Sequence, residues 1–206
     1  MNVRHTIISG PTRIPVMWAG LVGLLSLAAS LPAIAQIHYK VTDLGALPGL
    51  ADTYVWQQTL NNRGHVAAYA NSAANPNAFA GDVSFLWKGA GKVELLPDLP
   101  GASETLALGI NDLDQVVGAS GAAGGGVGAH AVLWEKGVAH DLGALPGDSG
   151  SEAYYINNRG VAVGGSCNAD ASVWSAVFWR EGKIHLLPPP KDSPTWTAFN
   201  LSLIHI

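Results

Sequence analysis

The stretch Asp141-Leu-Gly-Ala-Leu-Pro-Gly147, which leads into Tyr155-Ile-Asn-Asn-Arg-Gly-Val-Ala-Val-Gly164, is the clearest copy of a unit that recurs along the chain. An opening leucine, an asparagine after an apolar residue and a closing tryptophan return in the same order. These landmarks are Leu44, Leu96, Leu142 and Leu187, then Asn61, Asn111 and Asn157, then Trp87, Trp134 and Trp179. Self-similarity at a period of about 45 residues is typical of propellers and solenoids, whose units bury their faces against neighbouring units.

The third copy predicts four short strands joined by turns. Alternating or β-branched residues indicate the strands, and glycine-containing polar segments separate them. The predicted strands are residues 152–156, 161–164, 175–179 and 183–187, with a tight turn at 157–160 and a loop at 165–172. The second copy has Asp114 where the other turns have glycine. Because aspartate tolerates the left-handed region better than most residues, we expect the hairpin to form there too.

These features predict an all-β, propeller-like array of four-stranded blades, with about three complete repeats and partial ones. The repeats are placed at about 44–95, 96–141 and 142–186, with a partial repeat at 187–201, all within a β-repeat domain at 36–201. A β-sandwich is the alternative, because short strands with regular turns suit both architectures. The period of the repeat favours blades.

The first 35 residues have the organisation of a secretory signal peptide. Arg4 and Arg13 supply a basic region, Val16 to Leu31 is apolar, and Ala33-Ile34-Ala35 matches a cleavage site. An uncleaved membrane anchor is the alternative, but the apolar run is short for a membrane span. We therefore expect a mature chain that begins at Gln36, has no membrane span, and is secreted, extracellular or at the cell surface, with the periplasm as another destination.

Both ends of the remaining chain depart from the repeat. Residues 38–44 match the last strand of a unit whose earlier strands are missing, and in closed propellers such a strand often completes the final blade. Residues 202–206 stand where a new Asn-Asn-x-Gly turn is due. We expect this segment to be a non-native tail and the chain to be the N-terminal part of a longer protein.

Composition narrows the classes of partner. Without the signal peptide the chain has nine basic and fifteen acidic residues, and the basic residues form no cluster. This balance argues against nucleic acid as a partner. Cys167 is the single cysteine of the chain, so no internal disulfide can form, and an odd cysteine in an exported protein suggests a free thiol or a missing partner.

The repeat resembles the HAF family of extracellular repeat proteins over residues 38 to about 201. The resemblance rests on the Asp-Leu-Gly-x-Leu-Pro-Gly segment, the Ile-Asn-Asn-x-Gly-x-Val-x-Gly hairpin and the apolar strand that ends in tryptophan. The family's His-Ala-Phe triplet corresponds here to 83–85, 130–132 and 175–177, and no copy holds all three residues. The resemblance implies a secreted repeat protein and assigns it no activity.

Four residues are candidates for ligand contacts. His130 holds the histidine position of the triplet, Asp112 and Asp114 resemble the start of a calcium loop, and Trp174 falls outside the repeated tryptophan position. The calcium loop pattern is incomplete, because its later glycine and glutamate are missing. The repeated tryptophans are expected to pack in the core between units. No motif indicates a catalytic residue, a metal site or a cofactor; in particular, no Gly-x-Ser-x-Gly nucleophile elbow is present.

The sequence favours a non-enzymatic module that binds a protein or a glycan, with contacts on the variable loops 71–81, 121–128 and 165–172. One alternative is a propeller enzyme, a hydrolase or lyase acting on extracellular polysaccharide, for which Asp112, Asp114 and His130 are the nominated group. A purely structural surface repeat is a further alternative.

Overall fold

The computed structural model describes residues 50–72, 82–89, 91–122 and 128–188. The expected signal peptide, the strand at 38–44, the tail at 202–206 and most of the partial fourth repeat lie outside these residues. Among the described residues the chain forms strands and no helix, which confirms the all-β prediction. This part of the chain accordingly holds no helix that is long and apolar enough to cross a membrane.

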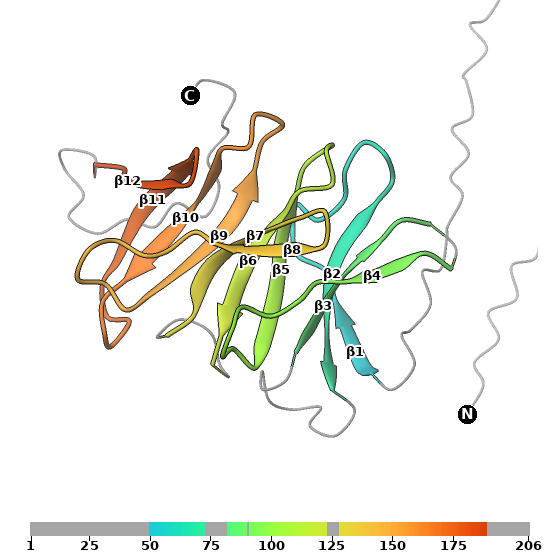
Figure 1. Ribbon diagram of the computed structural model, residues 1–206, viewed down its shortest axis with the longest axis horizontal. Helices are drawn as coiled ribbons and strands as arrows, with labels where there is room; N and C mark the ends of the chain where they lie inside the picture. The colour runs from blue at the N-terminus through green and yellow to red at the C-terminus, as the bar shows by residue number, and fades with distance from the viewer. Residues whose placement is uncertain (1–49, 73–81, 90, 123–127, 189–206) are drawn as a thin grey trace, which may run out of the picture. The chain divides into compact units, whose positions relative to one another are not determined.

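The strands form three four-stranded antiparallel sheets in chain order (Figure 1). The first sheet contains β1 (Leu50–Tyr54), β2 (Val66–Ser72), β3 (Val83–Trp87) and β4 (Val93–Leu95). The second contains β5 (Glu104–Ile110), β6 (Val116–Gly121), β7 (His130–Glu135) and β8 (Val138–Asp141). The third contains β9 (Gly150–Ile156), β10 (Ala162–Cys167), β11 (Trp174–Arg180) and β12 (Lys183–Leu186). In each sheet, strands that follow one another in sequence are hydrogen-bonded neighbours.

Each sheet has a tight turn before its second strand, and the turns share one backbone conformation. Gly64 and Gly160 have φ values of 76° and 75°, and Asp114 has a φ of 62° at the corresponding position of the second turn. Asp114 therefore adopts the left-handed conformation that glycine supplies in the other two turns. The predicted hairpin at this position is confirmed.

Three predicted loop boundaries were wrong. The loops expected from Asn71, Gly121 and Gly165 begin later, because β2 continues to Ser72, β6 to Gly121 and β10 to Cys167. The small and polar residues of β10 were taken for a loop, yet they pair with β9 on one side and β11 on the other. All of them are buried, so small side chains suit a central strand that has neighbouring chain on both faces.

The sheets pack face to face, and a tryptophan lies in each interface. Trp134 packs with Leu86 of the first sheet, and Trp179 packs with Val117 of the second; both tryptophans are 1% exposed. Their indole N–H groups donate to the segments that enter their own sheets, at Pro97 O (2.8 Å) and Gly143 O (3.3 Å). The prediction that these tryptophans pack in the core is confirmed, and Trp87 lies partly buried against an apolar cluster of the first sheet.

The first strands of the second and third sheets each carry a bulge. Pairing with the neighbouring strand skips Leu108 in β5 and Tyr154 in β9, which occupy the same repeat position. The backbone beside each bulge leaves no room for a side chain on the facing strand. A Cβ atom at Gly118 would lie 1.8 Å from the Leu106 carbonyl oxygen, and one at Gly164 would lie 1.9 Å from the Glu152 carbonyl oxygen. Glycine is therefore required at both positions for steric reasons.

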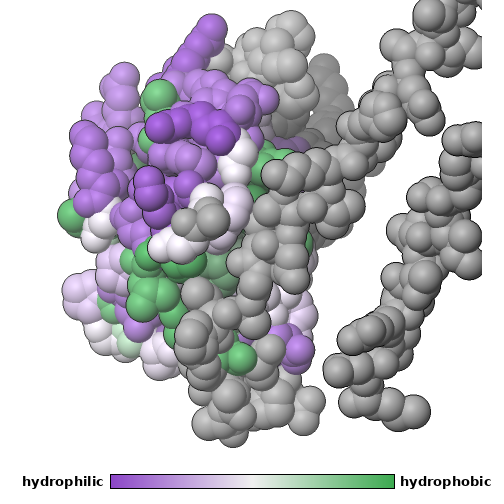
Figure 2. Space-filling model, turned by 90° about the vertical axis from the view of Figure 1, so that its right-hand side faces the viewer, coloured by the Kyte–Doolittle hydropathy of each residue, from purple (hydrophilic) through white to green (hydrophobic). Residues whose placement is uncertain are grey.

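The surface differs between the two ends of the sheets. Figure 2 shows the side of the molecule that carries the first sheet, with hydrophilic residues above and hydrophobic residues gathered below them. Exposed apolar side chains occur at the last residue of β1 and directly after it: Tyr54, Val55 and Trp56 are 41%, 60% and 49% exposed.

Two acidic side chains are buried between the first and second sheets. Asp82 and Glu104 are each 2% exposed, and the Thr105 N–H donates to the Asp82 carbonyl oxygen at 3.0 Å. Burial, and to a smaller extent the charge of Glu104, raise the pKa of the Asp82 carboxyl. The folded state therefore disfavours the ionised form of Asp82.

Replacing Asp82 by asparagine is expected to stabilise the protein at neutral pH by about 1–3 kcal/mol in a buffer without divalent ions. The raised pKa means that folding loses stability as the pH rises above the ordinary aspartate value of 3.8 and through the folded value. An asparagine does not ionise, so its advantage should be largest at neutral pH and disappear below about pH 4. Urea unfolding of both proteins across this range, in a chelator, measures the difference. A difference that is constant with pH would contradict this assignment.

Candidate functional site

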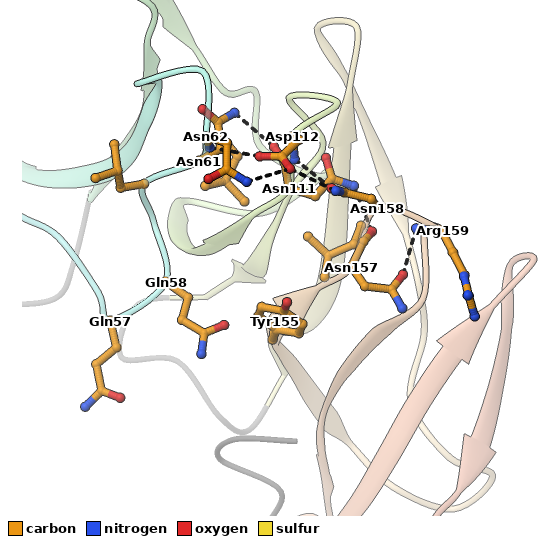
Figure 3. Close-up of a pocket in the computed structure, with 13 residues that line it drawn as sticks. Gln57, Gln58, Asn61, Asn62, Asn111, Asp112, Tyr155, Asn157, Asn158 and Arg159 are labelled. Carbon is orange, nitrogen blue, oxygen red and sulfur yellow. Dashed lines mark hydrogen bonds between the residues drawn. The ribbon is translucent and has the colours of Figure 1, made fainter. Parts of the chain in front are cut away.

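The tight turns of the three sheets lie at one end, and their side-chain amides are aligned across the sheets (Figure 3). Asn61, Asn111 and Asn157 occupy the same repeat position and form what we call the asparagine ladder. Asn61 is 8% exposed and Asn111 is 4% exposed, although both belong to turns at the end of a sheet. Such burial of a polar side chain requires hydrogen bonds.

Each asparagine of the ladder first shapes its own turn. The Asn111 Oδ1 atom accepts hydrogen bonds from the Leu113 and Gln115 N–H groups, both at 3.0 Å. Asn61 and Asn157 make the same pair of bonds in their own turns, at 2.9–3.0 Å. Asparagine is favoured at such positions because its side chain can replace a main-chain acceptor in a turn.

The remaining amide donors join neighbouring sheets. Asn61 Nδ2 donates to the Asn111 carbonyl oxygen, and Asn111 Nδ2 donates to the Asn157 carbonyl oxygen, both at 2.9 Å. One side chain thus determines the shape of its turn and the position of the next sheet. Since the same contact occurs twice, the ladder is a repeated device for stacking sheets in register.

The next residue of each turn forms a second column on the exposed side. The Asn62 N–H donates to Asp112 Oδ1 at 2.8 Å, and the Asp112 N–H donates to Asn158 Oδ1 at 2.9 Å. Asn62 Nδ2 and Asn158 Nδ2 also donate to Asp112 Oδ2, at 3.0 and 2.9 Å. These hydrogen bonds, the one from the Asn158 side chain first, lower the pKa of the Asp112 carboxyl. Asp112 is therefore an ionised acceptor held between two amides.

Asp114 is also fully engaged. Its Oδ1 atom lies 2.7 Å from His65 Nδ1 and accepts from Asn61 Nδ2 at 3.0 Å, and its Oδ2 atom accepts from Arg63 at 2.9 Å. All three partners belong to the tight turn of the first sheet, so Asp114 links the second sheet to the first through hydrogen bonds and an ion pair. Donors occupy the oxygen atoms of both Asp112 and Asp114, which leaves neither arranged as a cation ligand.

A hollow of about 580 Å³ opens beside the aligned turns. Amide side chains predominate in its lining, together with three aliphatic side chains, one tyrosine, one arginine and one aspartate. The lining residues are Gln57, Gln58, Leu60, Asn61, Asn62, Ile110, Asn111, Asp112, Tyr155, Ile156, Asn157, Asn158 and Arg159. Gln57 and Asn158 are exposed and Tyr155 is half-buried, so these side chains can reach a bound molecule.

Backbone contacts hold the wall of this hollow in place. Gln58 forms a parallel bridge with Gly109, and its carbonyl oxygen accepts from the Ile110 N–H at 3.1 Å. Gly109 in turn approaches the third sheet, because a Cβ atom there would lie 2.7 Å from the Tyr154 carbonyl oxygen. The first strands of the second and third sheets and the segment before β2 therefore meet at the hollow, which is formed by main chain as well as by side chains.

His130 lies at the other end of the second sheet. In β6, Val116 pairs with Trp134 next to the turn, whereas Ser120 pairs with His130 at the far end, roughly 13 Å along the strand. His130 Nδ1 lies 2.9 Å from Asp141 Oδ2, and Asp141 Oδ1 accepts from the Gly143 N–H. The structure therefore brings Asp112 and Asp114 near each other and separates His130 from both.

The other sequence candidates also lie away from the hollow. Trp174 is half-buried at the start of β11 and pairs with Cys167, which is buried as a free thiol. Of the binding loop expected at 165–172, residues 165–167 belong to β10, and residues 168–172 follow β10 at the end opposite its tight turn. The other two expected binding loops, 71–81 and 121–128, lie largely outside the described residues.

The repeated asparagines were recognised in the sequence as landmarks of the repeat. Their position in the lining of the hollow was not predicted. The feature of the sequence that could have indicated the site is the pair of adjacent amides at 61–62 and 157–158, together with Gln57 and Gln58. Comparison with family models, with curated proteins and with solved structures found no match to the chain.

Proposed function

We propose that the protein is a secreted or cell-surface repeat module, without enzymatic activity, that binds a neutral glycan in the amide-lined hollow. The observation that carries the proposal is the composition of the lining, in which amide side chains surround a half-buried tyrosine. Concave sites with a few convergent polar groups are the usual location of small ligands. The sequence supports export through the features of residues 1–35.

The chemistry of the lining suits sugar hydroxyl groups. A carboxamide carries one acceptor oxygen and two donor hydrogens, so it can donate to one hydroxyl of a sugar and accept from the next. Gln57 and Asn158 present such groups without a net charge, which favours a neutral ligand over an anion. The ring of Tyr155 supplies an aromatic surface of the kind that packs against the apolar face of a pyranose.

The asparagine ladder reduces the entropic cost of binding. Asn61 and Asn111 are fixed by their own turns and by the next sheet, so they set the shape of the hollow before a ligand arrives. Binding to a preformed site loses less side-chain and loop entropy than binding that must order the site. We therefore assign structural roles to Asn61 and Asn111, and ligand contacts to the exposed amides beside them.

The arrangement supports recognition better than acid–base catalysis. Asp112 is the single carboxylate in the lining of this hollow, and the amides that flank it lower its pKa. An efficient proton donor or acceptor needs a pKa near the working pH, and hydrogen bonds that stabilise the carboxylate move Asp112 away from that range. The group nominated for a polysaccharide hydrolase or lyase also requires His130, which lies at the far end of the sheet.

The packing of the sheets supports a propeller-like array. Each sheet is a four-stranded meander, and the first strands, β5 and β9, pack against the preceding sheets in chain order. This is the relation between successive blades of a propeller, whose loops at one end carry the ligand site. In this proposal the three sheets are successive blades and the hollow lies where their first strands converge.

Replacing Gln57 and Tyr155 together by alanine is expected to weaken glycan binding at least about tenfold and to leave the unfolding temperature nearly unchanged. A glycan array selects the strongest neutral oligosaccharide, and isothermal titration calorimetry then measures its dissociation constant for the wild type and for the double variant. Asn168→Ala, which removes an amide from a turn outside the hollow, is the matched control and should bind like the wild type. An array on which no neutral glycan binds would refute the proposal.

A further inference from the structure

The interface between the first and second sheets ends in a cluster of buried oxygen-bearing side chains. Asn71, Asp82, Ser84 and Glu104, which we call the polar cluster, are 6%, 2%, 0% and 2% exposed. The cluster lies at the opposite end of the strands from the asparagine ladder. It belongs neither to the amide-lined hollow nor to the His130–Asp141 pair.

Backbone pairing brings these residues together. Ala70 pairs with Val83 between β2 and β3, so the register places Asn71 beside Asp82. The Thr105 N–H donates to the Asp82 carbonyl oxygen at 3.0 Å, and the Ser84 N–H donates to Thr105 Oγ1 at 2.8 Å. Glu104 precedes Thr105, and its charge contributes to the raised pKa of Asp82.

Ser84 points into this interface. Leu86, which lies on the same face of β3 because side chains two residues apart share a face, packs in the core cluster with Trp134 of the second sheet. The Ser84 Oγ atom is buried and has no hydrogen-bond partner within the described part of the chain. It supplies an oxygen atom without a hydrogen-bond partner beside the carboxylate of Asp82.

The Asp82 carboxylate is likewise orphaned. Neither of its oxygen atoms has a hydrogen-bond partner among the described residues, although the side chain is almost completely buried. A carboxylate without donors is costly to bury, and such groups are normally protonated, paired or bound to a metal ion. A bound cation would satisfy the orphaned oxygens of both Asp82 and Ser84.

The corresponding interface between the second and third sheets shows that acids are not needed for stacking. Ala129 and Ala131 occupy the repeat positions of Asp82 and Ser84, and both are 1% exposed or less. The main-chain bonds around them are retained, because the Ser151 N–H donates to the Ala129 carbonyl oxygen and the Ala131 N–H donates to Ser151 Oγ. The same stacking therefore forms with alanine, so packing alone does not account for the polar cluster.

We propose that the polar cluster binds a divalent cation of the calcium type, through the carboxylates of Asp82 and Glu104, the Ser84 hydroxyl and the Asn71 amide oxygen. Calcium takes hard oxygen ligands and accepts a mixture of carboxylate, carbonyl and hydroxyl groups. The two carboxylates balance the charge of the ion. All four groups would bind through oxygen atoms, with no nitrogen or sulfur ligand, which disfavours a softer ion such as zinc.

Occupation of the cluster would couple cation binding to the stability of the interface. Asn71 belongs to β2, Asp82 directly precedes β3, Ser84 belongs to β3, and Glu104 belongs to β5. The ion would therefore join the first and second sheets, at the end opposite the asparagine ladder. Extracellular modules commonly bind calcium with dissociation constants of about 0.1–1 mM. A site of this affinity would be filled outside the cell and empty in a chelating buffer.

The full chain should bind calcium in isothermal titration calorimetry, and its unfolding temperature should rise in about 1 mM calcium chloride relative to a chelating buffer. Terbium, which replaces calcium, should give luminescence excited through nearby aromatic residues such as Tyr69. Asp82→Asn and Glu104→Gln should each weaken calcium binding at least about tenfold. Asp170→Asn, which changes an exposed aspartate in a turn, is the matched control and should keep wild-type affinity.

The wild-type titration needs no variant, so a folding defect in either variant leaves the test decisive. Absence of calcium binding and of terbium luminescence at millimolar concentrations would overturn the proposal and leave a shared proton as the occupant of the cluster. Calcium binding that survives in both variants would also overturn it. Glycan binding is measured separately in a chelating buffer, so failure of one proposal does not decide the other.

Discussion

Replacing Asn111 by alanine is expected to lower the free energy of unfolding by about 3–5 kcal/mol, most of the stability of a domain at the low end of the usual range of about 5–15 kcal/mol. The Asn111 side chain is 4% exposed and makes four hydrogen bonds. Alanine would leave the Leu113 and Gln115 N–H groups without their acceptor and the Asn157 carbonyl oxygen without its cross-sheet donor. Each such loss costs roughly 1–3 kcal/mol where the orphaned group stays buried.

Asn168→Ala is the matched control for this prediction. Asn168 makes a similar turn contact, because its Oδ1 atom accepts from the Val173 N–H, but it makes no bond to another sheet and lies in an exposed turn. We expect a loss of about 1 kcal/mol or less. Equilibrium unfolding in urea measures both variants. Equal losses would show that the ladder contributes no more than an ordinary turn.

Gly118→Ala is expected to destabilise the protein by about 3 kcal/mol or more, or to prevent folding. A Cβ atom at this position would lie 1.8 Å from the Leu106 carbonyl oxygen and 3.1 Å from the ring of Trp134. The first contact is with main chain at the bulge of β5, so no rotation of a side chain can relieve it. Accommodating the methyl group would require the two strands to separate.

Gly64→Ala separates this steric effect from the general cost of losing a glycine. Gly64 has a φ of 76°, but no atom lies within 4 Å of the position of its missing Cβ. The expected loss is therefore the conformational penalty alone, about 1–2 kcal/mol. Thermal unfolding by circular dichroism compares the variants. A Gly118→Ala variant as stable as Gly64→Ala would mean that the bulge can move aside.

The sequence was sufficient to predict features that depend on local pattern and on the repeat. Alternation and β-branched residues predicted the strands of the third sheet, and the tolerance of aspartate for positive φ predicted the turn at Asp114. The repeated tryptophans were predicted to be core residues because they close an apolar strand in each copy. These inferences needed only chain neighbours and a second copy for comparison.

The hollow and the polar cluster depend on contacts between neighbouring repeats, and the repeat pattern does not specify these contacts. Asn111 reaches the carbonyl oxygen of Asn157, 46 residues later, and nothing in the sequence states how one copy is placed on the next. The burial of Asp82 was likewise hidden, because in sequence it follows a polar segment rich in alanine and asparagine. Strand boundaries at Asn71 and Gly165 were misplaced for the same reason, since pairing on both sides outweighed local composition.

Nuclear magnetic resonance of the side-chain amide groups shows directly whether the exposed amides of the hollow contact a neutral glycan. The protein, labelled with nitrogen-15, is titrated with the oligosaccharide that binds best on the array, and the side-chain resonances of asparagine and glutamine are followed. We expect progressive shifts for Gln57 and Asn158, smaller shifts for Asn61 and Asn111, and none for Asn168. Binding that shifts Asn168 or the residues near His130, and leaves Gln57 and Asn158 unchanged, would contradict it.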